Sequence, residues 1–540
     1  MVKCENQIQE CLPPCVLLED EHLLVVNKPP GWNTHAPSPY AGEGIYDWLR
    51  HREPRWALLA IVHRLDKETS GVLVFARTPL ANRSLTTQFT RREVRKRYLF
   101  LSANRPARPV LRVETTLGRR GERYESVRGG AGQTAITEFR FLESLENERF
   151  LIEARPLTGR THQIRVHASE RGFPVLGDVL YGGPMAGRLC LHATELVIRH
   201  PASDEALTLT VPPDFAPNQD PLREAVLAVE ETNAWRLSHG AADLVTRGGQ
   251  AVDRWGDWLL SMSEPGRELD RAALEAWARK YGLRGAYHKS LRRDVRGKTG
   301  PEASPCLQWG EAAPERFPVR ENGVRYEVSF AEGYSVGLFL DQRDNRRRLL
   351  VNHVAAGFSA FPGVPAGAEL LNVFAYTCAF SVCGAMAGAR TTSLDLSRKY
   401  LDWGRRNFEL NGLDPSGHDF IFGDAFDWMR RLAKKGRRFD VVLLDPPTFS
   451  TSKSGGRFQA DEDLGRLLAT ALPLVGAGGR LFVSTNALRV GPEAFLAEVA
   501  RAIGDGGRRA VRQHYVPQPP DFPVTREEPA HLKTVWTQLD

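Results

Sequence analysis

Two aspartates could do chemistry because of where they stand along the chain. Asp66 lies in "HRLDKETSGVLVFA" (63–76), ahead of an apolar run typical of a buried strand. Asp445 lies in "VVLLDPPTFS" (441–450), directly after four apolar residues. An aspartate in a turn most often caps neighbouring amides, whereas one that an arginine orients can act as a nucleophile or base. Each stretch on its own leaves both possibilities open.

Three other stretches accompany Asp66 and carry a family resemblance. They are "KPPGWNTH" (28–35), "KRY" (96–98) and "PLTGRTHQIRVHASERGFPVLGDVLYGG" (156–183). Together with "HRLDKETSG", and in this order, they resemble the motifs of RluA-like pseudouridine synthases over about residues 15 to 215. The resemblance implies a mixed-sheet domain that isomerises uridine in RNA to pseudouridine.

The same resemblance implies roles for individual residues. Asp66 corresponds to the nucleophile, Tyr98 to the tyrosine beside the base, and Arg165 to the arginine that orients the carboxylate. Arg64 is a candidate to fill the stack that a flipped uridine leaves, with a local salt bridge as its alternative role. Lys28 and His35 fall in the motif expected on the substrate side. The reaction breaks a C–N bond and rejoins the same base through carbon, so no cofactor is expected.

A second group of motifs surrounds Asp445. The stretches "GLFLDQRDNR" (337–346), "LLNVFAYTCAFSV" (370–382), "SLDLSRKYLDWGRRNFELNG" (393–412) and "DVVLLDPPTFSTSK" (440–453) resemble the RlmI/RlmK-like class I methyltransferases of large-subunit ribosomal RNA. This resemblance implies S-adenosylmethionine as the cofactor. In such folds the ligand lies at the carboxyl ends of the strands. The expected cofactor-binding residues are Asp341, Arg343, Phe374, Tyr376, Asp395, Asp424 and Asp445, and the expected base-binding residues are Pro446, Pro447 and Phe449.

Two residues depart from that family's pattern. Methylation of cytosine C5 requires a cysteine nucleophile, but the corresponding stretch here is "FVSTNALR" (482–489), with Asn486. Guanine N7, or another base nitrogen, is therefore favoured over cytosine C5. The second departure is Cys378, which stands where the family has glycine. Because glycine accepts a positive φ that cysteine resists, weaker cofactor binding is expected.

Composition and apolar patterning predict several domains. The 540 residues exceed the size of one domain, and 42% of them are hydrophobic. We predict a mixed-sheet synthase domain (1–215), a linker (216–224), a small α/β domain (225–330) and a doubly wound methyltransferase domain (331–540). The stretch 292–318 is rich in glycine, proline and charge and is interpreted as a long exposed connection.

Charge and cysteine usage limit the partners. The net charge of +7, with arginine the more common basic residue, permits a polyanionic partner. Together with the two resemblances it leads us to expect structured RNA, with ribosomal RNA favoured and transfer RNA left open. No apolar run is long enough to span a membrane and the first residues are polar, so a cytoplasmic location without membrane association is expected. Cys4, Cys11 and Cys15 lack the spacing of a zinc site, and no metal is expected. The oligomeric state is left open.

These observations predict a bifunctional RNA-modifying enzyme and leave two alternatives. In the first, only the synthase is active and the methyltransferase fold serves to bind RNA, which the Cys378 departure motivates. In the second, both folds bind RNA without catalysis during ribosome assembly, which the retained Asp66 argues against.

Overall fold

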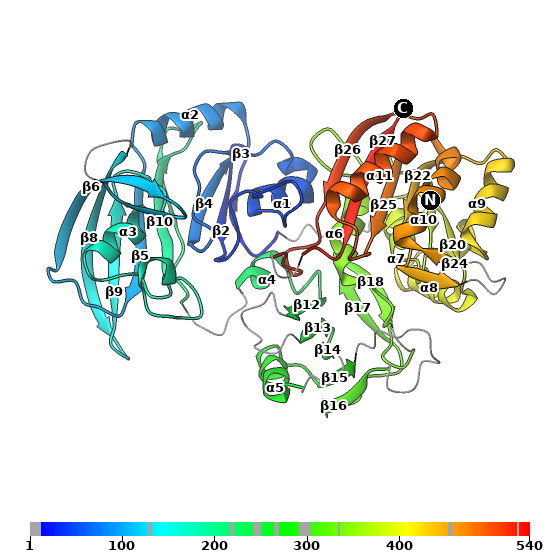
Figure 1. Ribbon diagram of the computed structural model, residues 1–540, viewed down its shortest axis with the longest axis horizontal. Helices are drawn as coiled ribbons and strands as arrows, with labels where there is room; N and C mark the ends of the chain where they lie inside the picture. The colour runs from blue at the N-terminus through cyan, green and yellow to red at the C-terminus, as the bar shows by residue number, and fades with distance from the viewer. Residues whose placement is uncertain are drawn as a thin grey trace.

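The chain folds into three sheet-containing regions that follow one another along the sequence. In this computed structural model the described residues are 12–127, 132–215, 221–240, 250–263, 269–290, 304–332, 335–451, 457–525 and 529–540. The first region, at the left of Figure 1, and the last, at the right, flank the smaller middle region below them. No helix of the described residues is long and apolar enough to cross a membrane.

The first region is built on one mixed sheet of eleven described strands, ordered β1-β2-β4-β10-β5-β9-β8-β6-β7, with β3 and β11 pairing at its side. Every residue of β4, "SGVLVFA", is buried, as expected for a central strand. The α2 helix begins at Pro79 after Thr78, whose side chain accepts a hydrogen bond from the Ala81 N–H. The strands are β1 (Val16–Glu19), β2 (Leu23–Lys28), β3 (Ala60–Ile61), β4 (Ser70–Ala76), β5 (Arg95–Ser102), β6 (Val110–Arg120), β7 (Arg123–Ser126), β8 (Gln133–Leu145), β9 (Arg149–Pro156), β10 (Leu191–Arg199) and β11 (Ala206–Thr210), and the helices are α1 (Ile45–Arg52), α2 (Pro79–Thr90) and α3 (Gln163–Glu170).

The middle region holds a five-stranded sheet in the order β12-β13-β14-β15-β16. Helix α4 (Pro221–Val226) begins inside the predicted linker 216–224, of which residues 216–220 lie outside the described residues. The predicted exposed connection 292–318 instead contains β16, which pairs with β15, and the start of β17, which pairs with β18; residues 291–303 are not described. The elements are β12 (Ala234–His239), β13 (Ala251–Trp255), β14 (Trp258–Ser263), α5 (Arg271–Lys280), β15 (Gly285–Ser290) and β16 (Cys306–Gly310), followed by the hairpin of β17 (Phe317–Glu321) and β18 (Val324–Val328).

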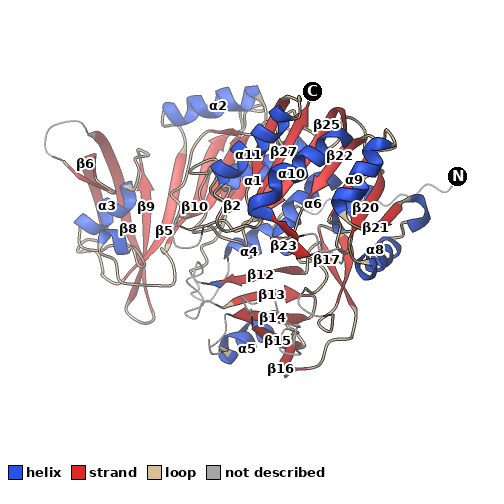
Figure 2. Ribbon diagram, turned by 45° about the vertical axis from the view of Figure 1, so that its right-hand side comes forward, coloured by secondary structure: helices blue, strands red, loops and turns tan. Residues whose placement is uncertain are grey.

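The C-terminal region is the doubly wound sheet that the sequence predicts. Its order is β21-β20-β19-β22-β25-β27-β26, parallel except for β27, which runs antiparallel to both neighbours. Successive strand residues such as Leu370 and Leu371 belong to separate cores on opposite faces, and Figure 2 shows helices covering the sheet. The elements are α6 (Arg343–Leu350), β19 (Glu369–Val373), α7 (Ala379–Met386), β20 (Arg390–Asp395), α8 (Arg398–Leu410), β21 (Asp419–Phe422), α9 (Ala425–Lys434), β22 (Phe439–Leu444), β23 (Phe449–Thr451), β24 (Arg457–Gln459), α10 (Ala460–Ala471), β25 (Val475–Thr485), α11 (Pro492–Asp505), β26 (Ala510–Val516) and β27 (Lys533–Leu539).

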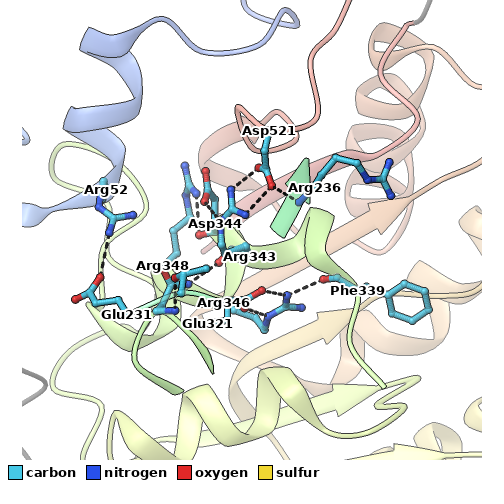
Figure 3. A network of polar contacts seen from close by, with 12 residues as sticks. Arg52, Glu231, Arg236, Glu321, Phe339, Arg343, Asp344, Arg346, Arg348 and Asp521 are labelled. Atoms are coloured by element: carbon cyan, nitrogen blue, oxygen red, sulfur yellow. Dashed lines mark hydrogen bonds and ion pairs between the residues drawn. The ribbon is translucent and has the colours of Figure 1, made fainter. Parts of the chain in front are cut away.

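Charged side chains join the three regions. Arg347 of α6 forms an ion pair with Glu53, which follows α1. Arg52 of α1 lies 3.5 Å from Glu231 of the middle region. Figure 3 labels Arg52 with Glu231 and three arginines of α6, namely Arg343, Arg346 and Arg348. The first and middle regions also share one apolar core, to which Trp32 and Trp235 both contribute.

Candidate active sites

The first candidate site is a cavity of about 450 Å³ in the N-terminal region, lined by the turn before β4, the end of α2, β5 and the residues leading into α3. Asp66, Tyr98 and Arg165 all line this cavity, so the structure brings together three residues from separate motifs. Arg92, Lys96 and Arg160 line it as well, giving the cavity a cationic rim suited to a polyanion.

Arg165 forms an ion pair with Asp66 while it is itself held in place by Asp178. Its Nη1 lies 3.8 Å from Asp66 Oδ2. Its Nε and Nη2 donate to the two carboxylate oxygens of Asp178 at 2.7 and 2.8 Å, and Asp178 is buried. The planar fork is thus fixed on one side and presents its remaining nitrogen to Asp66. Asp178 is a site residue that sequence reasoning quoted within a motif without giving it a role.

Tyr98 and His162 complete the surroundings of Asp66. Burial, with the nearby Asp66 charge, raises the pKa of Tyr98, so its phenol keeps its proton at neutral pH and can donate. His162 Nε2 lies 4.0 Å from Asp66, and its other ring nitrogen hydrogen-bonds the Tyr181 hydroxyl at 2.8 Å. His162 has a left-handed backbone, with φ 57°, at the start of α3.

The other predicted residues of this site differ in position. Arg64 is exposed on the cavity wall, where its Nη2 donates to Thr161 Oγ1 at 3.3 Å rather than to a carboxylate. Lys28 and His35 do not line the cavity. Lys28 is buried, and its Nζ donates to the carbonyls of Pro29, Trp32 and Lys67. The bond to Lys67 holds the loop that carries Asp66. His35 is exposed.

The second candidate site is a cavity of about 710 Å³ at the carboxyl ends of β19, β20 and β22, a size that suits a cofactor. Its wall combines carboxylates with aromatic rings. The predicted residues that line it are Asp341, Phe374, Tyr376, Asp395, Asp424, Asp445, Pro446, Pro447 and Phe449. Phe339, Tyr400 and Phe426 also line it; each lies within a few residues of a predicted carboxylate, but no role was assigned to these aromatic residues from the sequence.

Two carboxylates on neighbouring strand ends fit a ribose and an adenine. Asp395 ends β20, and its two oxygens accept the backbone N–H groups of Tyr376 and Ser397, both at 2.8 Å. These bonds fix the carboxylate and leave lone pairs for hydroxyl donors. Asp424 accepts the Asp427 N–H at 3.1 Å, so it both caps α9 and lines the cavity. Capping α9 and binding a ligand in the cavity are therefore compatible for Asp424.

Asp445 sits in a different electrostatic environment. Burial, together with the nearby Asp341 charge, raises its pKa to about 6 although Ser484 and Gln342 donate hydrogen bonds to it. Burial also opposes ionisation of Asp341, but a hydrogen bond at 3.1 Å to His531 lowers the pKa of Asp341 below its usual range. Asp445 therefore titrates closer to neutrality than Asp341.

Cys378 adopts the conformation that glycine would favour. Its φ is 61° and it precedes α7, so the left-handed turn is kept. The buried side chain does not line the cavity. It packs against α8 at Gly404, where an added Cβ would lie 2.3 Å from the Cys378 sulfur. The cysteine therefore adopts the positive φ that it was expected to resist, and its side chain lies against α8 rather than in the cavity.

Arg343 was predicted to bind the cofactor, but it does not line the cavity. It forms a buried two-point ion pair with Asp521, as Figure 3 shows. Arg346, one helical turn later, lines the cavity instead and donates to Glu321 at 2.6 and 2.8 Å. The sequence could not tell which of Arg343 and Arg346 lines the cavity. Both arginines stand in one charged stretch, and both are buried in ion pairs.

Each half of the chain matches a different family of known proteins. A family model described as RNA pseudouridylate synthase matches residues 22–170, and one described as S-adenosylmethionine-dependent methyltransferase matches residues 269–536. The Ribosomal RNA large subunit methyltransferase I of Escherichia coli O139:H28 is 32% identical over 307 residues, which cover 56% of this chain and 72% of the relative.

Solved structures are similar to each half separately. A methyltransferase complexed with SAH is 28% identical, with a TM-score of 0.48, over 57% of this chain and 76% of the other. Human RNA Pseudouridylate Synthase Domain Containing 4 is 28% identical, with a TM-score of 0.31, over 37% of this chain and 88% of the other.

The family models and the curated relative agree with the two sets of motifs in the sequence. The cofactor of the C-terminal domain is S-adenosylmethionine, as its family model states. The chain belongs to the S-adenosylmethionine-dependent methyltransferases, carries an RNA pseudouridylate synthase domain ahead of that domain, and is a bifunctional RNA-modifying enzyme.

Proposed function

We propose that the N-terminal domain converts uridine in large-subunit ribosomal RNA to pseudouridine with Asp66 as the nucleophile. The observation that carries this proposal is the Asp66–Arg165–Asp178 arrangement in a cationic cavity. Arg165 holds the carboxylate toward the sugar, and the protonated phenol of Tyr98 lies beside the base. No cofactor is needed, because the bond broken and the bond formed belong to the same nucleotide.

The C-terminal domain, in this proposal, methylates a base nitrogen of the same class of RNA, with guanine N7 first. When bound, S-adenosylmethionine supplies an electrophilic methyl group. Asp395 would hold the ribose hydroxyls and Asp424 the adenine, while Phe374 and Tyr376 pack around the ligand. Pro446, Pro447 and Phe449 would position the target base, whose ring nitrogen needs no base catalyst; catalysis is then mostly orientation.

The choice of nitrogen rests on Asn486. This residue lines the cavity and accepts a hydrogen bond from Thr448 Oγ1 at 2.6 Å. It offers no thiol for attack on cytosine C6, a step that C5 methylation requires. Ribosomal RNA as substrate rests on the name of the curated relative, Ribosomal RNA large subunit methyltransferase I.

The two sites allow a reciprocal test. RNA from a deletion strain that expresses wild-type protein, Asp66→Asn or Asp445→Asn is mapped for pseudouridine by carbodiimide labelling and primer extension, and its nucleosides are analysed by mass spectrometry. Asp66→Asn should lose one or more pseudouridines and keep the methyl mark, whereas Asp445→Asn should do the reverse. Retention of every wild-type pseudouridine by Asp66→Asn would contradict the synthase assignment.

Calorimetry decides whether the methyltransferase domain is more than an RNA-binding module. The wild-type chain should bind S-adenosylmethionine, and Asp395→Ala should bind it at least tenfold more weakly because the ribose loses its acceptor. Absence of binding by the wild type at high micromolar cofactor would leave the synthase as the active half.

A further inference from the structure

Three metal-ligating side chains meet where the N-terminal region contacts the C-terminal one. They are Glu43 before α1, His51 in the last turn of α1, and His514 on β26. One ligand atom from each lies within 4.8 Å of the others. Glu43 Oε1 and His51 Nδ1 are 2.5 Å apart, and the two imidazole centroids are 4.5 Å apart. None of the three lines either cavity.

His514 gives an independent reason to expect a ligand. Its Nε2 is buried and has no hydrogen-bond partner among the described residues. A buried polar atom without a partner destabilises a fold, so such atoms call for an explanation. A cation that accepts the nitrogen lone pair is one explanation, because a neutral imidazole is a metal ligand.

We propose that Glu43, His51 and His514 bind one divalent transition-metal ion, with Zn²⁺ the best match. Two imidazoles and one carboxylate are a ligand set that zinc accepts in tetrahedral sites, with water in the fourth position. Mg²⁺ and Ca²⁺ are disfavoured because they prefer oxygen ligands. Spacing in the sequence could not find this set, since its members come from the two ends of the chain.

The ion would bridge the synthase domain and the methyltransferase domain. Glu43 and His51 flank α1 of the synthase domain, whereas His514 belongs to an edge strand of the methyltransferase sheet. The same contact holds Tyr40 against Tyr515, with ring centroids 5.5 Å apart. Arg348 Nη2, 3.9 Å from Glu43 Oε1, is a positive charge that opposes the ion. Removal of that charge should therefore tighten metal binding.

The test uses the full chain, stripped with chelator and dialysed against Zn²⁺ buffered at 1 µM free ion. We expect one more equivalent of zinc in the wild type than in His514→Gln or His51→Gln. His353→Gln is the matched control: this histidine lies at the same contact, where its Nε2 hydrogen-bonds the Arg50 carbonyl at 2.8 Å, but it is not in the ligand set. It should keep the full equivalent, and Arg348→Gln should bind about tenfold more tightly.

Cobalt substitution distinguishes this site from cysteine ligation, including by Cys4 and Cys11, which lie outside the described residues. Nitrogen and oxygen ligands give visible d–d bands without the near-ultraviolet charge-transfer band of a thiolate. His514→Gln should lose the d–d bands while its circular dichroism stays that of the wild type. Full zinc retention by His514→Gln, or no zinc in the wild type, would overturn the proposal. Neither outcome bears on RNA modification.

Discussion

At the scale of single residues, the contact between Cys378 and Gly404 explains how a cysteine replaces glycine in the cofactor loop. A Cβ at position 404 would lie 2.3 Å from the Cys378 sulfur. Gly404→Ala alone should destabilise the fold by about 1–3 kcal/mol through overpacking. In the Cys378→Gly background the same change should stabilise it, because alanine favours a helix by about 1 kcal/mol over glycine.

Denaturant unfolding of the four variants of this double-mutant cycle measures the coupling. Cofactor affinity, followed by calorimetry, should change less than threefold in Cys378→Gly, since the sulfur does not line the cavity. A large gain in affinity would show that the cysteine obstructs the ligand after all.

Asp445 predicts a pH dependence in which activity and stability move in opposite directions. Its folded-state pKa of about 6 lies above the ordinary value, mainly because of burial. We propose that the ionised carboxylate of Asp445 helps to hold the target base, so methyl transfer should fall about tenfold per pH unit below pH 6, where the carboxyl is protonated and has lost its charge. The raised pKa stabilises the fold at low pH, and this contribution is lost as pH rises through 6.

Asp445→Asn removes that titration. At pH 7.5 the variant should be more stable than the wild type by about 2–3 kcal/mol, and below about pH 3 the difference should vanish. Rate profiles from pH 5 to 8, with parallel thermal melts, check both statements. If the wild type lost its fold as well as its activity below pH 6, protonation of Asp445 would not be the cause of the lost activity.

At the scale of elements, helix α6 links the methyltransferase cavity to the synthase domain. Arg346 lines the cavity, and Arg347 pairs with Glu53 while both side chains are about nine-tenths buried. Arg347→Ala should cost about 1.5–3 kcal/mol, because it removes the hydrogen-bonded partner of a buried carboxylate and leaves only Arg52, 3.7 Å away. The double variant Arg347→Ala/Glu53→Ala should recover part of this loss. Chemical unfolding of the three variants gives the coupling, and strict additivity would show that the pair contributes nothing.

The sequence indicated residues of both cavities because each of these residues stands in a short contiguous stretch with a recognisable pattern. Asp66 and Asp445 could be singled out from contiguous stretches, and the parallel sheet follows from alternating apolar strands and helices. Contacts between distant segments were not accessible: the packing of Cys378 on Gly404 and the choice between Arg343 and Arg346 depend on how helices pack. Lys28 likewise matched a motif but serves the loop beneath the site.

At the scale of the whole molecule, the shared core between the first two regions means that the sequence motifs do not mark independent folding units. Trp32 and Leu49 of the first region belong to the same buried cluster as Val226 and Trp235. The Cys15 N–H also donates to the Ala225 carbonyl at 2.9 Å. The predicted boundary at residue 215 therefore cuts through apolar contacts.

A fragment of residues 1–215 should consequently expose apolar surface that the full chain buries. We expect it to melt at least 5 °C below a fragment of residues 1–330 and to bind a hydrophobic dye, since an exposed apolar patch weakens the fold and promotes association. The longer fragment keeps the shared core and should retain the far-ultraviolet dichroism of its part of the chain. Equal melting temperatures and equal dye binding would show that the synthase domain is stable without its neighbour, and the contacts at Val226 and Trp235 would then be incidental.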